Sequence, residues 1–71
     1  MERYANRSGG SGISAYEIGS NYIKVRFSSG SIYQYSYRKA GQSHVENMKR
    51  LASSGSGLNS YINSYVKFKY D

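Results

Sequence analysis

Apolar and polar residues alternate along the first half of the chain, which predicts β-strands. Within residues 22–27 the apolar side chains fall on every second position, at Ile23, Val25 and Phe27, and polar or basic side chains stand between them. A period of two is typical of a strand with one buried and one solvated face. A shorter β-like run covers residues 13–18, and a turn signal separates the two runs. The pattern therefore predicts two successive strands.

A third strand follows across a hairpin whose loop length decides which face its aromatic side chains occupy. This strand carries a tyrosine at alternate positions, Tyr33, Tyr35 and Tyr37. A three-residue loop, with Gly30 at positive φ, pairs Val25 with Tyr33 and places the tyrosines on the apolar face. A two-residue loop shifts the register by one residue and moves them to the face of Lys24 and Arg26. The Ser-Ser-Gly turn favours the first alternative, which buries the first two tyrosines and leaves the third nearer the surface.

Two helical patterns follow, each with apolar residues three and four positions apart. Ser43 to Glu46 match the S-x-x-E capping box that begins a helix, and Gly55 suits a left-handed stop near residues 53–54. The apolar face of this first helix consists of Val45, Met48, Leu51 and Ala52. Ser56 is placed to cap a second helix. Its apolar positions are Leu58, Tyr61, Ile62 and Tyr65.

The two ends of the chain differ in pattern. Residues 1–12 include a Ser- and Gly-rich run with little to bury, which predicts a flexible leader. Residues 66–70 alternate apolar side chains with Lys67 and Lys69, which predicts a last strand whose lysines protect a sheet edge. The expected single domain therefore covers residues 13–71. Its expected class is α+β, a small antiparallel β-sheet with two short helices on one face, in the order β-β-β-α-α-β.

Composition limits how this domain is stabilised and where it is expected. The 71 residues include no cysteine and one histidine, so we expect neither a disulfide nor a structural metal site, and no cofactor. Nine tyrosines and two phenylalanines supply much of the apolar surface available for a core. No apolar run is long enough to span a membrane, and the N-terminus lacks the apolar middle of a signal peptide. We therefore expect a cytoplasmic protein that does not insert into membranes.

Two runs of residues carry a resemblance to a known family. Residues 25–35 combine a strand, a glycine turn and a central Tyr-x-Tyr, and residues 52–62 combine an Ala-Ser-Ser-Gly run with the start of a last helix. Over residues 12–70 the chain resembles the KTSC domain, a small module that occurs alone in bacterial and phage proteins and at the C-terminus of some lysyl-tRNA synthetases. The resemblance implies RNA binding, which has been suggested for the family, and it implies no established substrate or catalytic residue.

Charge points to the same class of partner. Ten Lys and Arg against four acidic residues give a net charge of +6, which favours polyanions. Aromatic rings interleaved with basic side chains are typical of surfaces that bind single-stranded nucleic acid, because the rings stack on bases and the cations neutralise phosphates. The expected nucleic-acid-binding residues are Lys24, Arg26, Tyr37, Arg38, Lys39, Lys49, Arg50, Lys67 and Lys69.

The sequence predicts binding and no catalysis. The acidic residues show no paired spacing suited to acid–base chemistry, and His44 falls in the first turn of a predicted helix, where a surface role is expected. The leading hypothesis is a small basic module that binds nucleic acid weakly, RNA in the first place. The alternative is a protein–protein interaction module that uses an exposed strand edge and tyrosines. The salt dependence of binding distinguishes the two.

Overall fold

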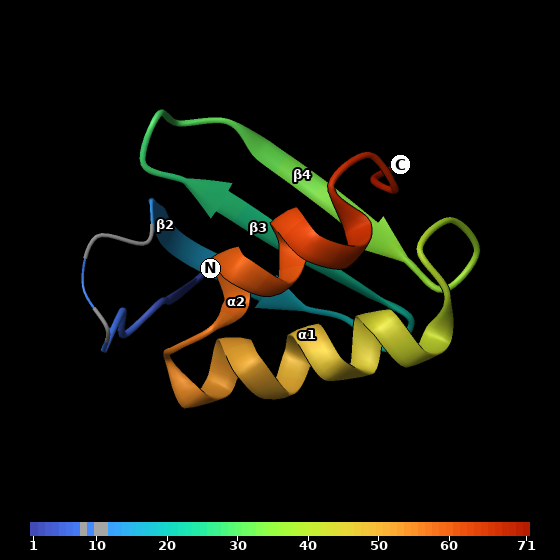
Figure 1. The fold of residues 1–71 in the computed structure, drawn as a ribbon, viewed down its shortest axis with the longest axis horizontal. Helices are drawn as coiled ribbons and strands as arrows, with labels where there is room; N and C mark the ends of the chain where they lie inside the picture. The colour runs from blue at the N-terminus through green and yellow to red at the C-terminus, as the bar shows by residue number, and fades with distance from the viewer. Residues whose placement is uncertain (8, 10–11) are drawn as a thin grey trace.

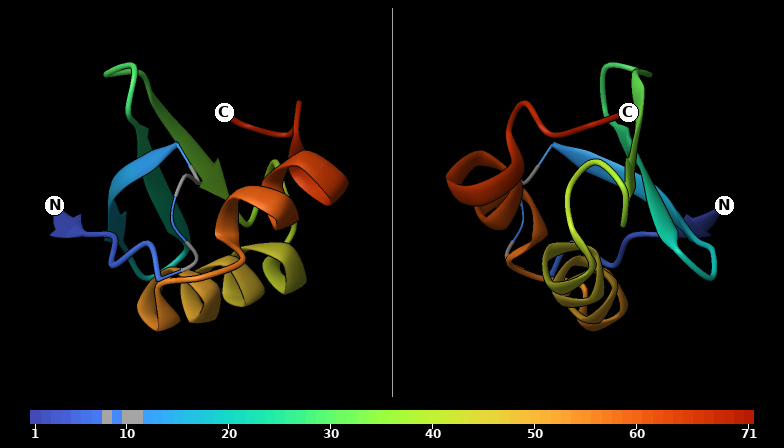
Figure 2. Two further views of the ribbon diagram at one scale, coloured as in Figure 1. Left: turned by 60° about the vertical axis from the view of Figure 1, so that its left-hand side comes forward. Right: turned by 90° about the vertical axis from the view of Figure 1, so that its right-hand side faces the viewer.

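The fold is an antiparallel sheet with helices on one face, which confirms the predicted α+β class (Figure 1). The computed structural model describes residues 1–7, 9 and 12–71. The sheet has the order β1-β2-β3-β4, and the helices follow it in the chain. The bounds are β1 Glu2–Arg3, β2 Ile13–Ile18, β3 Tyr22–Phe27, β4 Ile32–Ser36, α1 Gln42–Ser54, α2 Leu58–Tyr61 and the π-helical turn η1 Ile62–Val66. Figure 2 shows that the helices all lie on the same side of the sheet and leave the other face uncovered.

The hairpin between β3 and β4 has the register that a three-residue loop predicts. Val25 lies opposite Tyr33, and Gly30 adopts a φ of 98°. The N–H of Phe27 donates to the carbonyl of Ser31 at 2.8 Å, which closes the loop. Tyr35 is consequently 1% exposed, whereas Tyr33 on the same face is 39% exposed. The predicted core position is confirmed for Tyr35 and is wrong for Tyr33, which is exposed. Tyr37, expected nearer the surface, is half-buried and packs against the core.

The predicted flexible leader is wrong over its first residues, which complete the sheet. Glu2 lies opposite Tyr16 and Arg3 opposite Ala15, so β1 pairs antiparallel with β2. Tyr4 follows directly and is 3% exposed, and its large ring forms part of the buried core. Residues 8, 10 and 11 of the predicted leader lie outside the described residues.

The predicted last strand is also wrong, because the second helix continues further than its pattern suggested. Val66 ends η1 and is fully buried, and residues 67–71 adopt turn and irregular backbone. Leu58, Ile62 and Val66 form a buried row four residues apart. A π-helical turn needs more residues per turn than an α-helix, which favours the spacing of four and turns Tyr65 outward to 58% exposure. Val66 therefore belongs to the buried face of the helix and does not begin a strand, although residues 66–70 alternate apolar and basic side chains.

Both helices begin without the caps that the sequence predicted. α1 follows Gly41 at φ 100°, and within the described residues no side chain caps its N-terminus. Glu46 of the predicted capping box instead accepts a hydrogen bond from Tyr37, the residue that directly follows β4. Ahead of α2, Gly57 takes the capping position expected for Ser56, and the hydroxyl of Tyr4 accepts the N–H of Leu58 at 3.3 Å. The predicted end of α1 is confirmed, since Gly55 adopts a left-handed φ of 82°.

The core lies between the sheet and the helices. β3 and β4 contribute Ile23, Val25 and Tyr35, which are at most 1% exposed. The remaining buried apolar side chains come from the N-terminus, β2 and the helical half, namely Tyr4, Ile13, Ala40, Val45, Met48, Ala52, Leu58, Ile62 and Val66. Among the described residues, the helices are too short and too polar to cross a membrane.

Candidate functional site

A cluster of aromatic side chains borders a groove where the β3–β4 hairpin meets the end of the helical half. The groove has a volume of about 240 Å³, and Ile62 and Asn63 of η1 form one side of it. Its other lining side chains define what we call the aromatic groove: Phe27, Tyr33, Tyr35, Lys67, Phe68 and Tyr70. The groove therefore joins a hairpin to a segment far along the chain. In Figure 1 the red C-terminal segment lies beside β4.

Four of the rings in the aromatic groove, those of Phe27, Tyr33, Tyr35 and Tyr70, pack against one another. The ring centroids of Tyr33 and Tyr70 are 4.7 Å apart, and those of Phe27 and Tyr33 are 5.7 Å apart in an edge-on arrangement. Tyr35 lies beneath them, with its centroid 6.5 Å from that of Tyr70. Burial, and then the neighbouring phenols of Tyr33 and Tyr70, raise the pKa of Tyr35 to about 12. The floor of the groove is thus a neutral ring across the whole physiological range.

The upper rim of the groove is unusually open for apolar side chains. Phe68 is 78% exposed, and Tyr70 is 37% exposed. Exposed rings that gather at one place mark interaction surfaces more often than scattered ones do. The ammonium group of Lys67 lies 5.6 Å from the centre of the Phe68 ring. A cation and stacking surfaces are therefore side by side.

Asp71 holds this C-terminal segment against β4. Its backbone N–H donates to the carbonyl of Gln34 at 2.7 Å. Its carboxylate accepts hydrogen bonds from the Gln34 amide at 2.8 Å and the Ser36 hydroxyl at 2.7 Å. The Ser36 hydrogen bond first, then the one from Gln34, holds the pKa of Asp71 below its ordinary value, and Lys39 adds a smaller effect of the same sign. These contacts fix Tyr70 over the groove.

Four of the predicted basic residues lie on this side of the molecule or beside it. Lys67 and Lys69 belong to the C-terminal segment and are exposed. Arg38 and Lys39, in the loop after β4, are exposed as well, and the influence of Lys39 on Asp71 places the two groups near each other. The predicted set also contained basic residues that lie on other surfaces.

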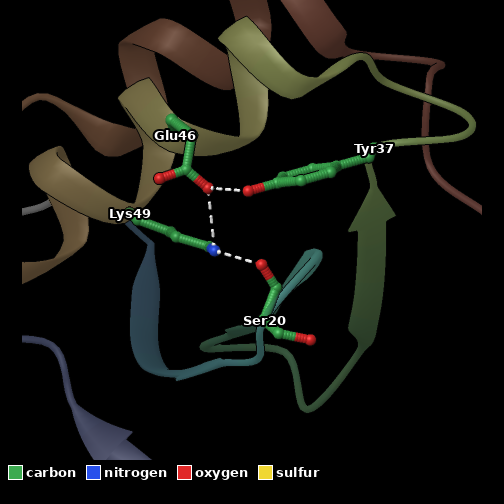
Figure 3. A network of polar contacts seen from close by, with 4 residues as sticks. All are labelled: Ser20, Tyr37, Glu46 and Lys49. Atoms are coloured by element: carbon green, nitrogen blue, oxygen red, sulfur yellow. Dashed lines mark hydrogen bonds and ion pairs between the residues drawn. The ribbon is translucent and has the colours of Figure 1, made fainter.

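Two further predicted residues, Tyr37 and Lys49, both bind the carboxylate of Glu46 within the protein (Figure 3). The hydroxyl of Tyr37 donates to Glu46, and Lys49 Nζ donates to the same carboxylate at 2.8 Å and to the carbonyl of Ser20 at 3.1 Å. The Lys49 hydrogen bond is the main reason that the pKa of Glu46 is lowered, and the same carboxylate raises the pKa of Lys49 and of Tyr37. This network ties α1 to the end of β4 and to the β2–β3 turn, so we assign it a structural role.

The other predicted residues are distributed over two further surfaces. Lys24 and Arg26 point from β3 to the uncovered face of the sheet, because they alternate with the buried Ile23 and Val25. Arg50 lies on α1 and donates to Asn47 Oδ1 at 2.6 Å. The nine predicted residues therefore do not form one patch.

Sequence reasoning missed most of the aromatic groove. Tyr33, Phe68 and Tyr70 were not among the predicted site residues. Tyr33 was expected in the core, and Phe68 and Tyr70 were expected on a last strand. This cluster forms because the chain after η1 brings Phe68 and Tyr70 to the β3–β4 hairpin, and no local sequence pattern predicts that path. The signal in the sequence was the density of rings in residues 65–70, next to two lysines.

Two other features of the surface are candidate sites: a cluster around His44 and a second hollow. His44 Nδ1 lies 2.7 Å from the hydroxyl of Tyr61, which also accepts from Asn47, and the ring of Tyr65 packs beside them. A second hollow, about 570 Å³, lies at the β1–β2 end and carries the acidic side chains of Glu2 and Glu17. Within the described residues no three His, Cys, Asp or Glu side chains gather as a metal site would require. Neither feature is suited to a polyanion.

Comparison of the chain with protein-family models, with curated proteins and with solved structures found no match. The resemblance to the KTSC domain stays a prediction.

Proposed function

We propose that this protein binds single-stranded nucleic acid, RNA in the first place, through the aromatic groove and its lysines. Bases stack on the exposed rings of Phe68, Tyr33 and Tyr70. Lys67 and Lys69 neutralise the phosphates on either side. The activity is binding, with no chemical step.

The exposed ring of Phe68 beside Lys67 is the observation that carries the proposal. A ring that is 78% exposed contributes little to folding, yet it lines the same groove as two partly exposed tyrosines and lies beside a cation. Stacking of a base on such a ring is worth about 1–3 kcal/mol, and it tolerates any sequence because every base has a π-face. The groove of about 240 Å³ suits one base at a time. Weak, sequence-tolerant binding follows.

The distribution of charge supports a single strand more than an acidic protein. Lys67, Lys69, Arg38 and Lys39 lie within the C-terminal half of the chain, where Asp71 is engaged by Gln34 and Ser36. A flexible strand can follow separated cations, whereas a folded acidic surface must match them all at once. Each phosphate contact adds to the salt dependence of binding.

The test is fluorescence anisotropy with a labelled single-stranded RNA and the matching DNA, at low salt and at about 0.15 M ionic strength. Phe68→Ala should weaken binding by about 5- to 150-fold, the equivalent of 1–3 kcal/mol. Lys67→Gln should weaken it too and lower the steepness of the salt dependence by about 0.7. Tyr65→Ala is the matched control, because Tyr65 is 58% exposed and lies with His44 away from the groove. Absence of binding at low salt, or equal losses in Phe68→Ala and Tyr65→Ala, would refute the proposal.

A protein partner remains the second candidate, and the edge of β4 favours it. The N–H of Asp71 already donates to the carbonyl of Gln34 from outside the sheet, so a carbonyl on this edge is accessible to a backbone donor. Ile32 on the same strand is 53% exposed. An added strand from a partner would bind through backbone hydrogen bonds with little dependence on salt. Salt-insensitive binding to a protein, with no binding of RNA or DNA, would favour this candidate.

A further inference from the structure

The uncovered face of the sheet carries two arginines in one line across the strands. Arg3 lies opposite Ala15, Ala15 lies opposite Arg26, and Arg26 lies opposite Ile32. Residues that are opposite each other in a sheet share a face, so these four side chains form one transverse row, which we call the arginine row. Neighbouring strands are about 4.8 Å apart, so the two arginine backbones are separated by roughly 10 Å. The sequence had placed one of these arginines in a flexible leader.

The arginine row is accessible and positively charged. Arg3 and Arg26 are both exposed, and Ala15 between them has too small a side chain to separate their guanidinium groups from a ligand. Among the described residues neither arginine takes part in an ion pair. The acidic residue on this face, Glu17, stands one row away opposite Lys24 and accepts a hydrogen bond from Tyr22 at 3.0 Å. The arginine row therefore keeps two uncompensated charges.

The arginine row meets the aromatic groove at the edge of β4. Ile32 and Tyr33 are consecutive, so their side chains point to opposite faces: Tyr33 lines the groove and Ile32 ends the arginine row. Ile32 is 53% exposed and gives an apolar surface at the crossing. Farther along the same edge, Asp71 sits against Gln34 and Ser36 and repels phosphates. The passage from one face to the other is thus open at the hairpin end of β4.

We propose that a single-stranded nucleic acid bound in the aromatic groove continues over Ile32 and binds the arginine row, with phosphates on Arg26 and Arg3. This inference rests on the proposed function and specifies its ligand. The ligand is a single strand long enough to reach both faces. A duplex does not fit, because it is stiff over about 150 base pairs and cannot turn around the edge of one β-strand.

The experiment measures anisotropy for labelled single strands of about 4 and about 12 nucleotides, a short and a long length within the range of about 4–16 nucleotides that a small single-strand-binding domain covers. The variants are Arg26→Gln and Arg3→Gln/Arg26→Gln. Arg50→Gln is the matched control, since it removes the same charge from α1, on the helical side of the molecule. Thermal melting confirms that each variant folds, which is expected because both arginines are exposed.

The expected result is a loss that depends on length. The double variant should bind the long strand several-fold more weakly, with a salt dependence reduced by about 1.4, the contribution of two phosphates on a single strand. Its affinity for the short strand should equal that of the wild type. An unchanged affinity for the long strand, or an equal loss for both lengths, would overturn the arginine row while leaving the groove proposal intact. Failure of the wild type to bind either strand would instead overturn the proposed function.

Discussion

The hydroxyl of Tyr4 accepts a hydrogen bond from the backbone N–H of Leu58, and so joins the N-terminal segment to the start of α2. Both residues are buried, at 3% and 0% exposure. The first N–H groups of a helix have no partner within it, and Tyr4 satisfies one of them from another part of the chain. A tyrosine therefore performs the role that a serine or asparagine commonly takes.

Replacement of this hydroxyl should destabilise the protein without changing its fold. Tyr4→Phe keeps the ring in the core but leaves the Leu58 N–H buried without an acceptor, at a cost of about 1–3 kcal/mol. Urea unfolding measures the loss. Tyr65→Phe, which removes an exposed hydroxyl, is the control and should lose almost nothing. Equal stability of the two variants would mean that the Tyr4 hydroxyl contributes nothing.

Gly55 is the position at which α1 cannot tolerate a side chain. It adopts φ 82°, and a Cβ built on it would lie 2.6 Å from the Cβ of Ala5. Gly30, at φ 98°, has open space around it. Gly30→Ala should therefore cost only the strain of a left-handed alanine, roughly 1 kcal/mol, whereas Gly55→Ala should cost clearly more. Thermal melting of both variants checks this, and a reversed order would contradict the contact with Ala5.

Glu46 should make stability fall in acid. Its hydrogen bonds with Lys49 first and Tyr37 second keep its pKa below the ordinary value of about 4.3. A carboxyl with a lowered pKa in the folded state stabilises the protein fully above its unfolded pKa, and this contribution disappears as the pH falls through the folded pKa. The melting temperatures of wild type and Glu46→Gln should thus converge as the solution becomes more acidic. Glu2→Gln, which removes an exposed carboxylate of β1, is the control, and a difference that stays constant with pH would contradict the network.

Tyr35 should ionise well above the ordinary range of a tyrosine in the folded protein. Burial raises its pKa to about 12, so its neutral form is favoured by folding. This contribution is complete below the ordinary phenol value of about 10 and is lost as the pH rises toward the folded value. Absorbance titration of tyrosinate should show a late step that Tyr35→Phe removes and Tyr65→Phe retains. A titration curve unchanged by Tyr35→Phe would show that this ring is not buried as described.

The sheet could be predicted where a strong local signal decided the pairing. β3 followed from its period of two, β2 from a short β-like run before a turn signal, and the glycine at residue 30 fixed the hairpin register. β1 could not be predicted in this way, because two residues are too few for a period to appear. The last strand failed for a different reason: residues 66–70 fit both a strand and the end of a helix, and burial of Val66 decided for the helix.

The candidate site was less predictable than the fold, because the sequence shows how many basic residues there are but not where the fold places them. Lys49 was expected on a binding surface, but its carboxylate partner is three residues away on the same helix and its other acceptor is Ser20. Phe68 was assigned to an ordered strand and instead stands exposed after η1. Arg3 gained its place beside Arg26 only through pairing of β1 with β2. Long-range contacts, which no local pattern encodes, set the position of Arg3 and one of the two acceptors of Lys49.

The order of the strands also has a kinetic consequence. β2, β3 and β4 are consecutive and joined by short turns, so their contacts close small loops and form early with little loss of chain entropy. The contact between Tyr4 and Leu58 closes a loop of 54 residues and needs both halves of the molecule in place. Interactions that form after the rate-limiting step slow unfolding and leave the folding rate unchanged. We therefore expect the N-terminal segment to dock late in folding, so that its loss shortens the lifetime of the native state and leaves the folding rate almost unchanged.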